Sequence, residues 1–180
     1  MMRSVLQLAL FVLLSFPIAS LARGSSAQRK SRAMNPFCGH TTYPFLCASA
    51  TGAFLGGQRP NAEAVLKMHL GAISHRSESA SRKAQQLMRR AKPGTFVLLK
   101  HCDDLYRAKW DMVGTALREL HSRDEQTKQM VHIMTQLLRQ SAEECDLSFH
   151  QSRISNPLSR YNRSIVKLAV NCDDLNNMMT

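Results

Sequence analysis

The sequence contains few of the patterns on which catalytic and metal sites usually depend. It has no Cys-x-x-Cys, no His-Glu-x-x-His and no glutamate with a histidine three residues later, so neither a zinc nor a di-iron site is expected. The glycines of "GAFLGG" (residues 52–57) precede no Lys-Ser or Lys-Thr, which argues against a phosphate-binding loop. We therefore expect a protein that is not an enzyme and that has no catalytic residue, cofactor or metal.

Titratable residues are present, but their spacing does not gather them into a site. The acidic doublets Asp103-Asp104, Glu143-Glu144 and Asp173-Asp174 could supply paired carboxylates. Adjacent residues of a helix point in different directions, however, so each doublet is expected to be a solvated edge. The seven histidines share no spacing, and His69, which falls on an apolar stripe, is interpreted as a satisfied core histidine.

Long apolar runs are absent after the first one, which extends from about Leu6 to Phe16. An early arginine and the small-residue exit "SLA" surround this run, a pattern typical of a cleaved signal peptide over residues 1–22. A membrane anchor is the alternative, but Pro17 cuts the run short of the ~20 apolar residues that a spanning helix needs. We expect a secreted, soluble mature protein that begins with a disordered, basic lead-in over residues 23–34.

Negative charge is scarce: 13 acidic residues face 24 lysines and arginines, for a net charge of +11. Clustered cations could neutralise nucleic-acid phosphates, but secretion argues against that partner. An acidic polysaccharide, an anionic membrane or an acidic protein is more consistent with an extracellular location. The plain alternative is a solvated surface that keeps the protein soluble.

Alternation of period two is also absent, whereas helix-period apolar residues recur in four segments. These segments cover about residues 61–90, 95–121, 124–151 and 157–179, with Asn61 and Asn156 as expected N-caps. Short connections favour an all-α, up-down-up-down four-helix bundle over residues 61–180, each helix having ~26 residues and a length of ~39 Å. The expected core positions are Ala62, Leu66, His69, Ile73, Ala80, Ala84 and Leu87; Leu99, Cys102, Tyr106, Trp110, Val113, Leu117 and Leu120; Met130, Met134, Leu137, Cys145 and Phe149; and Leu158, Tyr161, Ile165, Leu168, Cys172, Leu175 and Met179.

The five cysteines can be sorted by reflection about the predicted turns. Residues equidistant from the turn of an antiparallel hairpin face one another, and the midpoint of Cys102 and Cys145 lies in the turn before the third helix. The midpoint of Cys38 and Cys47 lies beside a Tyr-Pro that should bend the chain. We therefore predict the disulfides Cys38–Cys47 and Cys102–Cys145. Cys172 remains as a buried, inert thiol, the alternative being a reactive or metal-binding one.

Two surface features remain as candidates. Gln129, His132, Gln136 and Arg139 recur at helical spacing and form a polar stripe on the third helix, which suits either a partner-binding face or an ordinary solvated one. Asn162-Arg163-Ser164 is an acceptor sequence for N-glycosylation, and Asn162 is expected on a partly exposed flank.

Three motifs together resemble the plant invertase and pectin methylesterase inhibitor family. "CGHTTYPFLC" (residues 38–47) is similar to the first cysteine pair of that family, "CDDLY" (residues 102–106) to the segment that opens the second pair, and "AEECDLSF" (residues 142–149) to the segment that closes it. The resemblance covers the chain from about Asn35 onward. It implies an inhibitor domain over residues 35–180, in which an N-terminal helical hairpin (residues 35–60) precedes the bundle, and it implies the same two disulfides.

The resemblance further implies a secreted inhibitor of the plant cell wall, or apoplast, that binds its target one-to-one. Esterase-directed members cover the active-site cleft of pectin methylesterase, whereas invertase-directed members carry a Pro-Lys-Phe segment near the start of the third bundle helix. This chain has "SRDEQTKQMVH" there (residues 122–132), which favours the esterase over cell-wall or vacuolar invertase. The positive charge also predicts electrostatic association with de-esterified pectin. A helical ligand for a cell-surface receptor is the alternative from another class of function.

Overall fold

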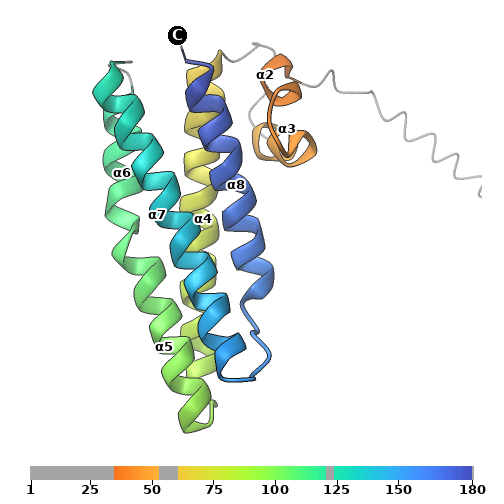
Figure 1. Cartoon of the computed structure of the whole chain (residues 1–180), viewed down its shortest axis with the longest axis vertical. Coiled ribbons are helices and arrows are strands. Elements are labelled where there is room, and N and C mark those ends of the chain that lie inside the picture. Colours follow the sequence, from red (N-terminus) through yellow and green to blue (C-terminus); the bar gives the residue numbers. More distant parts are fainter. Residues whose placement is uncertain (1–34, 53–60, 121–123, 180) are drawn as a thin grey trace, which may run out of the picture. The chain divides into compact units, whose positions relative to one another are not determined.

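Helices form the regular structure of the protein, and no strand occurs in the ranges that the structure covers. The computed structural model describes residues 35–52, 61–120 and 124–179 (Figure 1). The all-α class is therefore confirmed. The signal peptide and lead-in predicted for residues 1–34 lie outside the described residues, as do residues 53–60 between the hairpin and the bundle.

Four rods of helix form the bundle, and consecutive rods run in opposite directions (Figure 1). α4 packs against α5 and α8, and α7 packs against α5, α6 and α8. This is the predicted up-down-up-down order. The bundle elements are α4 (Ala62–Met88), α5 (Pro93–Ala108), α6 (Trp110–Glu119), α7 (Glu125–Gln151) and α8 (Ser159–Asn177).

Side-chain caps define where the two longest helices begin. The Asn61 side chain accepts a hydrogen bond from the Ala64 N–H at 2.9 Å, and α4 starts at the next residue, Ala62. The Asp124 side chain accepts from the Thr127 N–H at 2.7 Å at the start of α7. Each cap satisfies one of the N–H groups that a helix start leaves without a partner, so these boundaries agree with the sequence.

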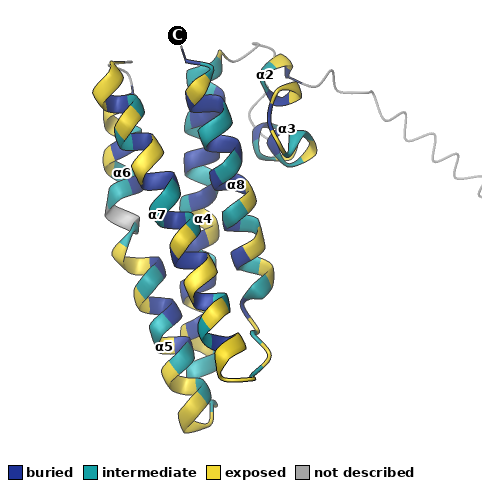
Figure 2. Ribbon diagram, viewed as in Figure 1, coloured by how far each residue is buried: buried dark blue, intermediate teal, exposed yellow. Residues whose placement is uncertain are grey.

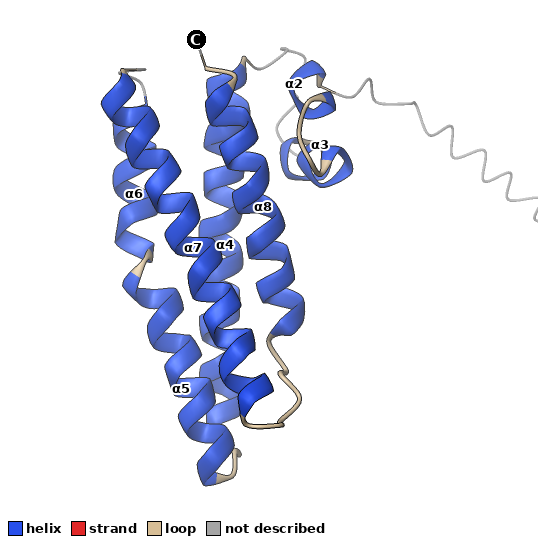
Figure 3. Ribbon diagram, viewed as in Figure 1, coloured by secondary structure: helices blue, strands red, loops and turns tan. Residues whose placement is uncertain are grey.

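The other two rods differ from the prediction. The second helix is interrupted at Lys109, which separates α5 from α6 (Figure 3). The fourth begins at Ser159 rather than Pro157 and has 19 residues, which makes it about 28 Å long instead of the expected ~39 Å. Asn156 is not its N-cap, because its side chain accepts from the Leu158 N–H at 2.8 Å within the turn before the helix.

The core follows the predicted stripes, with buried residues along the inner side of each rod (Figure 2). Phe149, Leu66, Leu99, Met134 and Ile165 are among the largest side chains that are almost completely buried. The Trp110 side chain lies outside the described residues. Several expected core residues are only half-buried: Ala62, Leu87, Leu117, Met130, Leu137 and Tyr161.

A small helical hairpin lies beside the bundle, as expected from the sequence. It consists of α2 (Pro36–Gly39) and α3 (Pro44–Thr51). A proline occupies the first turn of each helix, where the missing N–H costs no hydrogen bond. α3 contacts α4 and α8, so the hairpin covers one part of the groove between these two helices.

Candidate protein-binding face and the contacts that hold it

The turn of the hairpin is fastened to α8 by two side chains. The Tyr43 N–H donates to Asn171 Oδ1 at 2.9 Å, and Asn171 Nδ2 donates to the Tyr43 carbonyl at 3.0 Å. The neighbouring Thr42 N–H donates to Asp174 Oδ2 at 2.7 Å. Because Asn171 is fully buried and satisfies both backbone groups of one residue, the position of the hairpin depends directly on α8.

Both disulfides are present in the structure. Cys38 is bonded to Cys47 and Cys102 to Cys145, and all four side chains are buried. The first bond closes the hairpin turn, whereas the second joins α5 to α7. Cys172 is a free, fully buried thiol whose pKa is raised, mainly by burial and further by the carboxylates beside it in the sequence.

The expectation that Asn162 lies on a partly exposed flank is wrong. Its side chain is 0% exposed because Tyr106 donates its hydroxyl to Asn162 Oδ1 and Asn162 Nδ2 donates to Asp146 Oδ1 at 2.8 Å. Asn156 Nδ2 donates to the same carboxylate oxygen at 2.6 Å, and the Tyr106 hydroxyl also lies 3.4 Å from Cys145 Sγ. Burial and the Asp146 charge raise the pKa of Tyr106. The folded protein therefore has no space for a glycan at Asn162, which instead ties α8 to α5 and α7.

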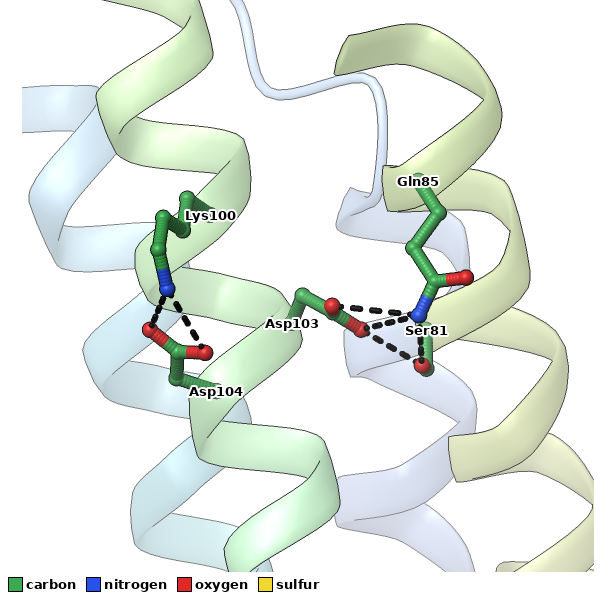
Figure 4. A network of polar contacts seen from close by, with 5 residues as sticks. All are labelled: Ser81, Gln85, Lys100, Asp103 and Asp104. Atoms are coloured by element: carbon green, nitrogen blue, oxygen red, sulfur yellow. Dashed lines mark hydrogen bonds and ion pairs between the residues drawn. The ribbon is translucent and has the colours of Figure 1, made fainter.

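The first acidic doublet is likewise not a solvated edge. Asp103 is 5% exposed and points from α5 toward α4, where it accepts hydrogen bonds from Ser81 at 2.5 Å and from Gln85 at 3.1 and 3.2 Å (Figure 4). Its neighbour Asp104 points outward and pairs with Lys100 at 2.8 Å. The two residues thus point in different directions, as helical geometry requires, but one of those directions is into the helix interface.

His69 is buried as predicted, but only one of its ring nitrogens is satisfied. Nδ1 lies 2.9 Å from the Val65 carbonyl, to which it donates, whereas Nε2 has no hydrogen-bond partner. Burial lowers the pKa of His69 more than this hydrogen bond raises it. The ring is therefore neutral in the folded protein at neutral pH.

The predicted polar stripe runs along α7. Gln129 and His132 are exposed, while Gln136 and Arg139 are half-buried. Arg139 Nε lies 3.6 Å from the Glu143 carboxylate, one helical turn further along. The four residues therefore share one side of α7, and their role in binding remains a prediction.

An acidic residue of α8 orders this stripe. Asp173 accepts a hydrogen bond from Thr135 at Oδ1, at 2.5 Å, and one from Gln136 Nε2 at Oδ2, at 3.1 Å. His132 Nδ1 lies 3.3 Å from the same Oδ1. The sequence assigned Asp173 to a solvated edge, and this too is wrong. No local pattern indicated the contact, because its partners lie 37 to 41 residues earlier in the chain.

An exposed apolar residue stands within this polar surface. Ile133 is 46% exposed and follows His132 on α7. It lies three residues after Met130 and four before Leu137, so its spacing alone placed it next to the expected core stripe and did not reveal its exposure. Beside it, a hollow of about 370 Å³ lies between the start of α7 and the end of α8, lined by Glu125, Lys128, Gln129, His132, Asn176 and Asn177. We refer to Gln129, His132, Ile133, Gln136 and Arg139 as the α7 face.

The α7 face offers amides, an imidazole, a guanidinium and one apolar side chain, which suit contact with another protein. Within the described ranges, no group of three histidine, cysteine, aspartate or glutamate residues is arranged to hold a metal ion. In the same ranges, none of the helices combines the length and apolar character needed to span a membrane.

Comparisons with known proteins agree with this architecture. A family model described as plant invertase/pectin methylesterase inhibitor matches residues 32–175. The crystal structure of mutant form A of a pectin methylesterase inhibitor from Arabidopsis is similar, with a TM-score of 0.67 and 17% identity, over 82% of this chain and 97% of that one. A pectin methylesterase inhibitor from Arabidopsis thaliana gives a TM-score of 0.61 and 19% identity, over 82% and 95%.

At these identities the solved structures establish a common fold. No curated protein sequence matches the chain. The family model, in contrast, covers both disulfides and all of the bundle except its last residues. On that basis the chain belongs to the plant invertase/pectin methylesterase inhibitor family.

Proposed function

We propose that this protein is a secreted inhibitor of pectin methylesterase, which it blocks by covering the active-site cleft in a one-to-one complex. The family match over residues 32–175 carries the proposal, because it includes the whole hairpin and nearly all of the bundle. The two similar crystal structures are both of proteins named as pectin methylesterase inhibitors. The two disulfides support secretion, since such bonds form and persist in oxidising compartments.

The α7 face is the surface that we propose for contact with the esterase. Interfaces commonly surround a few apolar or aromatic anchors with polar groups, and Ile133 stands among glutamine and histidine side chains in this way. Asp173 already holds His132 and Gln136 in place. Their side chains would therefore lose little additional conformational entropy on binding.

Inhibition can be measured as the release of methanol from methyl-esterified pectin by plant pectin methylesterases at acidic pH. Purified protein should suppress the release with a stoichiometry of one inhibitor to one enzyme. Lack of inhibition across a broad panel of plant esterases would disprove the proposal. Sucrose hydrolysis by invertases, measured in the same format, tests the alternative target, which the missing Pro-Lys-Phe segment disfavours.

A substitution at Ile133 tests the proposed face. Ile133→Arg should raise the inhibition constant by more than about tenfold, because it places a bulky cation where a complementary surface would close. Val97→Arg is the matched control, since Val97 is a 64% exposed apolar residue on α5. If both variants inhibit as well as the unmodified protein does, the contact surface is not on the α7 face.

A further inference from the structure

A row of cations follows one side of α8. Arg160, Arg163 and Lys167 are separated by three and four residues, so they share a helix face at intervals of about 4.5 and 6 Å along the axis. All three side chains are exposed. The result is a line of positive charge rather than a single basic point.

Across from this row, α4 supplies a fourth cation. Arg76 joins the three α8 residues in lining a hollow of about 470 Å³, together with Leu46 of α3 and Ser164. A second hollow of about 820 Å³ shares Leu46, Arg76 and Ser164 with the first and continues between α3, α4 and α8, with Lys67 and His75 in its lining. Neither lining includes an aspartate or glutamate. We call the two connected hollows the basic groove.

Most of the charge of the basic groove is not balanced by the protein itself; the exception is Lys67, which pairs with Glu63 at 2.7 Å. Within the described part of the chain, Arg76, Arg160, Arg163 and Lys167 form no ion pair with a carboxylate, whereas Arg82 and Lys100 elsewhere on the surface pair one turn along their helices. The Lys167 ammonium lies 5.2 Å from the centre of the Tyr43 ring, a cation–π contact that holds it at the edge of the groove. Unbalanced like charges in a concave site raise the local potential and attract an anion.

We propose that the basic groove binds a linear polyuronate, an acidic polysaccharide that carries carboxylates at regular intervals along one chain. The row of three cations on α8, with Arg76 across from it, suits a ligand with several charges, whereas a small anion would need only one or two of these cations. A single chain also enters a concave groove, which a flat membrane surface cannot do. The site lies on α3, α4 and α8, so the proposal goes beyond inhibition and does not require it.

The test uses a fluorescent oligogalacturonate titrated at low salt into the protein secreted from the full-length chain. The triple variant Arg76→Gln, Arg163→Gln and Lys167→Gln should weaken binding by about tenfold or more, because it removes three of the four unpaired cations of the groove. The matched control, Arg89→Gln, Arg90→Gln and Lys92→Gln, removes the same charge from exposed residues at the α4–α5 turn and should weaken binding by less than about threefold. The basic residues 23–34 are the same in all three proteins, so they cannot cause a difference in binding between them.

Two further binding measurements define the chemistry of the ligand. Added salt should release the oligomer, and a fully methyl-esterified oligomer of the same length should fail to bind. Equal losses in the two triple variants would overturn the proposal, since net charge alone would then explain binding. Binding that is indifferent to salt or to esterification would also overturn it, as would capture of anionic phospholipid vesicles, but not the oligomer, through the groove. The triple variant of the basic groove leaves the α7 face intact. It should therefore still inhibit the esterase on a soluble neutral substrate, which separates this proposal from the proposed inhibition of the esterase.

Discussion

The hairpin and the bundle each contain one disulfide, yet they are held in place by different forces. In the bundle, Cys102–Cys145 joins two long helices whose inner sides bury a continuous apolar core. In the hairpin, Cys38–Cys47 closes a turn with few buried apolar side chains of its own. That turn is attached to α8 by the hydrogen bonds of Asn171 and Asp174.

The difference indicates how the two regions respond to the loss of a single contact. Burial of apolar surface is spread over many residues, so the bundle should remain folded when one of its polar contacts is lost. A docked turn that depends on three hydrogen bonds, each with a net contribution of about 1 kcal/mol, is sensitive to each of them. The hairpin should therefore be the region that detaches first.

Removal of the disulfides gives the largest expected effect. The 43-residue separation of Cys102 and Cys145 predicts a loss of about 4 kcal/mol in the free energy of unfolding for Cys102→Ala with Cys145→Ala. Cys38→Ala with Cys47→Ala should loosen the hairpin, by about 3 kcal/mol for its shorter loop, and leave the bundle transition nearly unchanged. Urea unfolding followed by far-UV circular dichroism distinguishes the two. Equal destabilisation of the bundle by both double variants would show that hairpin and bundle unfold as one unit.

The next effect concerns the polar tie inside the bundle. Asp103→Ala should lower the free energy of unfolding by about 2 to 3 kcal/mol, because Ser81 and Gln85 lose a charged acceptor in the α4–α5 interface. Asp104→Ala removes the adjacent, exposed carboxylate and should cost less than about 0.5 kcal/mol. Thermal and urea denaturation measure both. Similar costs would mean that the buried network contributes no more than the surface ion pair.

A smaller effect, confined to the hairpin, is expected from Asn171. Asn171→Ala leaves both backbone groups of Tyr43 without their α8 partner and should destabilise hairpin docking by about 2 kcal/mol. Hydrogen exchange at the Tyr43 amide should accelerate accordingly, roughly thirtyfold. Asn177→Ala, at an exposed position of the same helix, is the control. Unchanged protection at Tyr43 in the Asn171 variant would contradict the proposed dependence of the hairpin on α8.

The smallest effect depends on pH and belongs to the bundle. Since the pKa of His69 is lowered on folding, only the unfolded chain takes up its proton just below pH 6.5, and stability is lost as the pH falls through that value toward the folded pKa. From pH 7 to pH 5.5 the contribution of this residue to the free energy of unfolding should therefore fall. His69→Leu should remove that part of the pH dependence, while His75→Leu, at an exposed position of the same helix, should not. Urea unfolding at several pH values measures this dependence. If the free energy of unfolding changes with pH to the same extent in both variants, His69 is not the source of the pH dependence.

The sequence predicted those parts of the fold that depend on neighbouring residues. Asn61 could be predicted as a cap because a cap acts within three residues, and the apolar period placed the start of the third helix near Asp124 and determined which sides of the helices are buried. The cysteine pairs could be predicted because antiparallel hairpins relate residues by simple reflection. The break at Lys109 could not be, since neither proline nor glycine stands there.

Contacts between polar residues of different helices were beyond the reach of sequence reasoning. Asn162, Asp103 and Asp173 were all expected at least partly in solvent, because a polar side chain beside a core stripe has no local feature that reveals a distant partner. Each instead bonds to a residue 16 or more positions away. The α7 face depends on such a contact, so the sequence could suggest its residues but not the carboxylate that orders them.

The burial of Cys172 has a consequence for the chemistry of the four bonded cysteines. Disulfides exchange when a thiolate attacks one of their sulfurs, so an unpaired cysteine in the same chain is a potential source of scrambling. In the folded protein this thiol is inaccessible, and its raised pKa keeps it protonated and therefore a poor nucleophile. The packing of α8 thus protects both disulfides from exchange with the protein's own fifth cysteine.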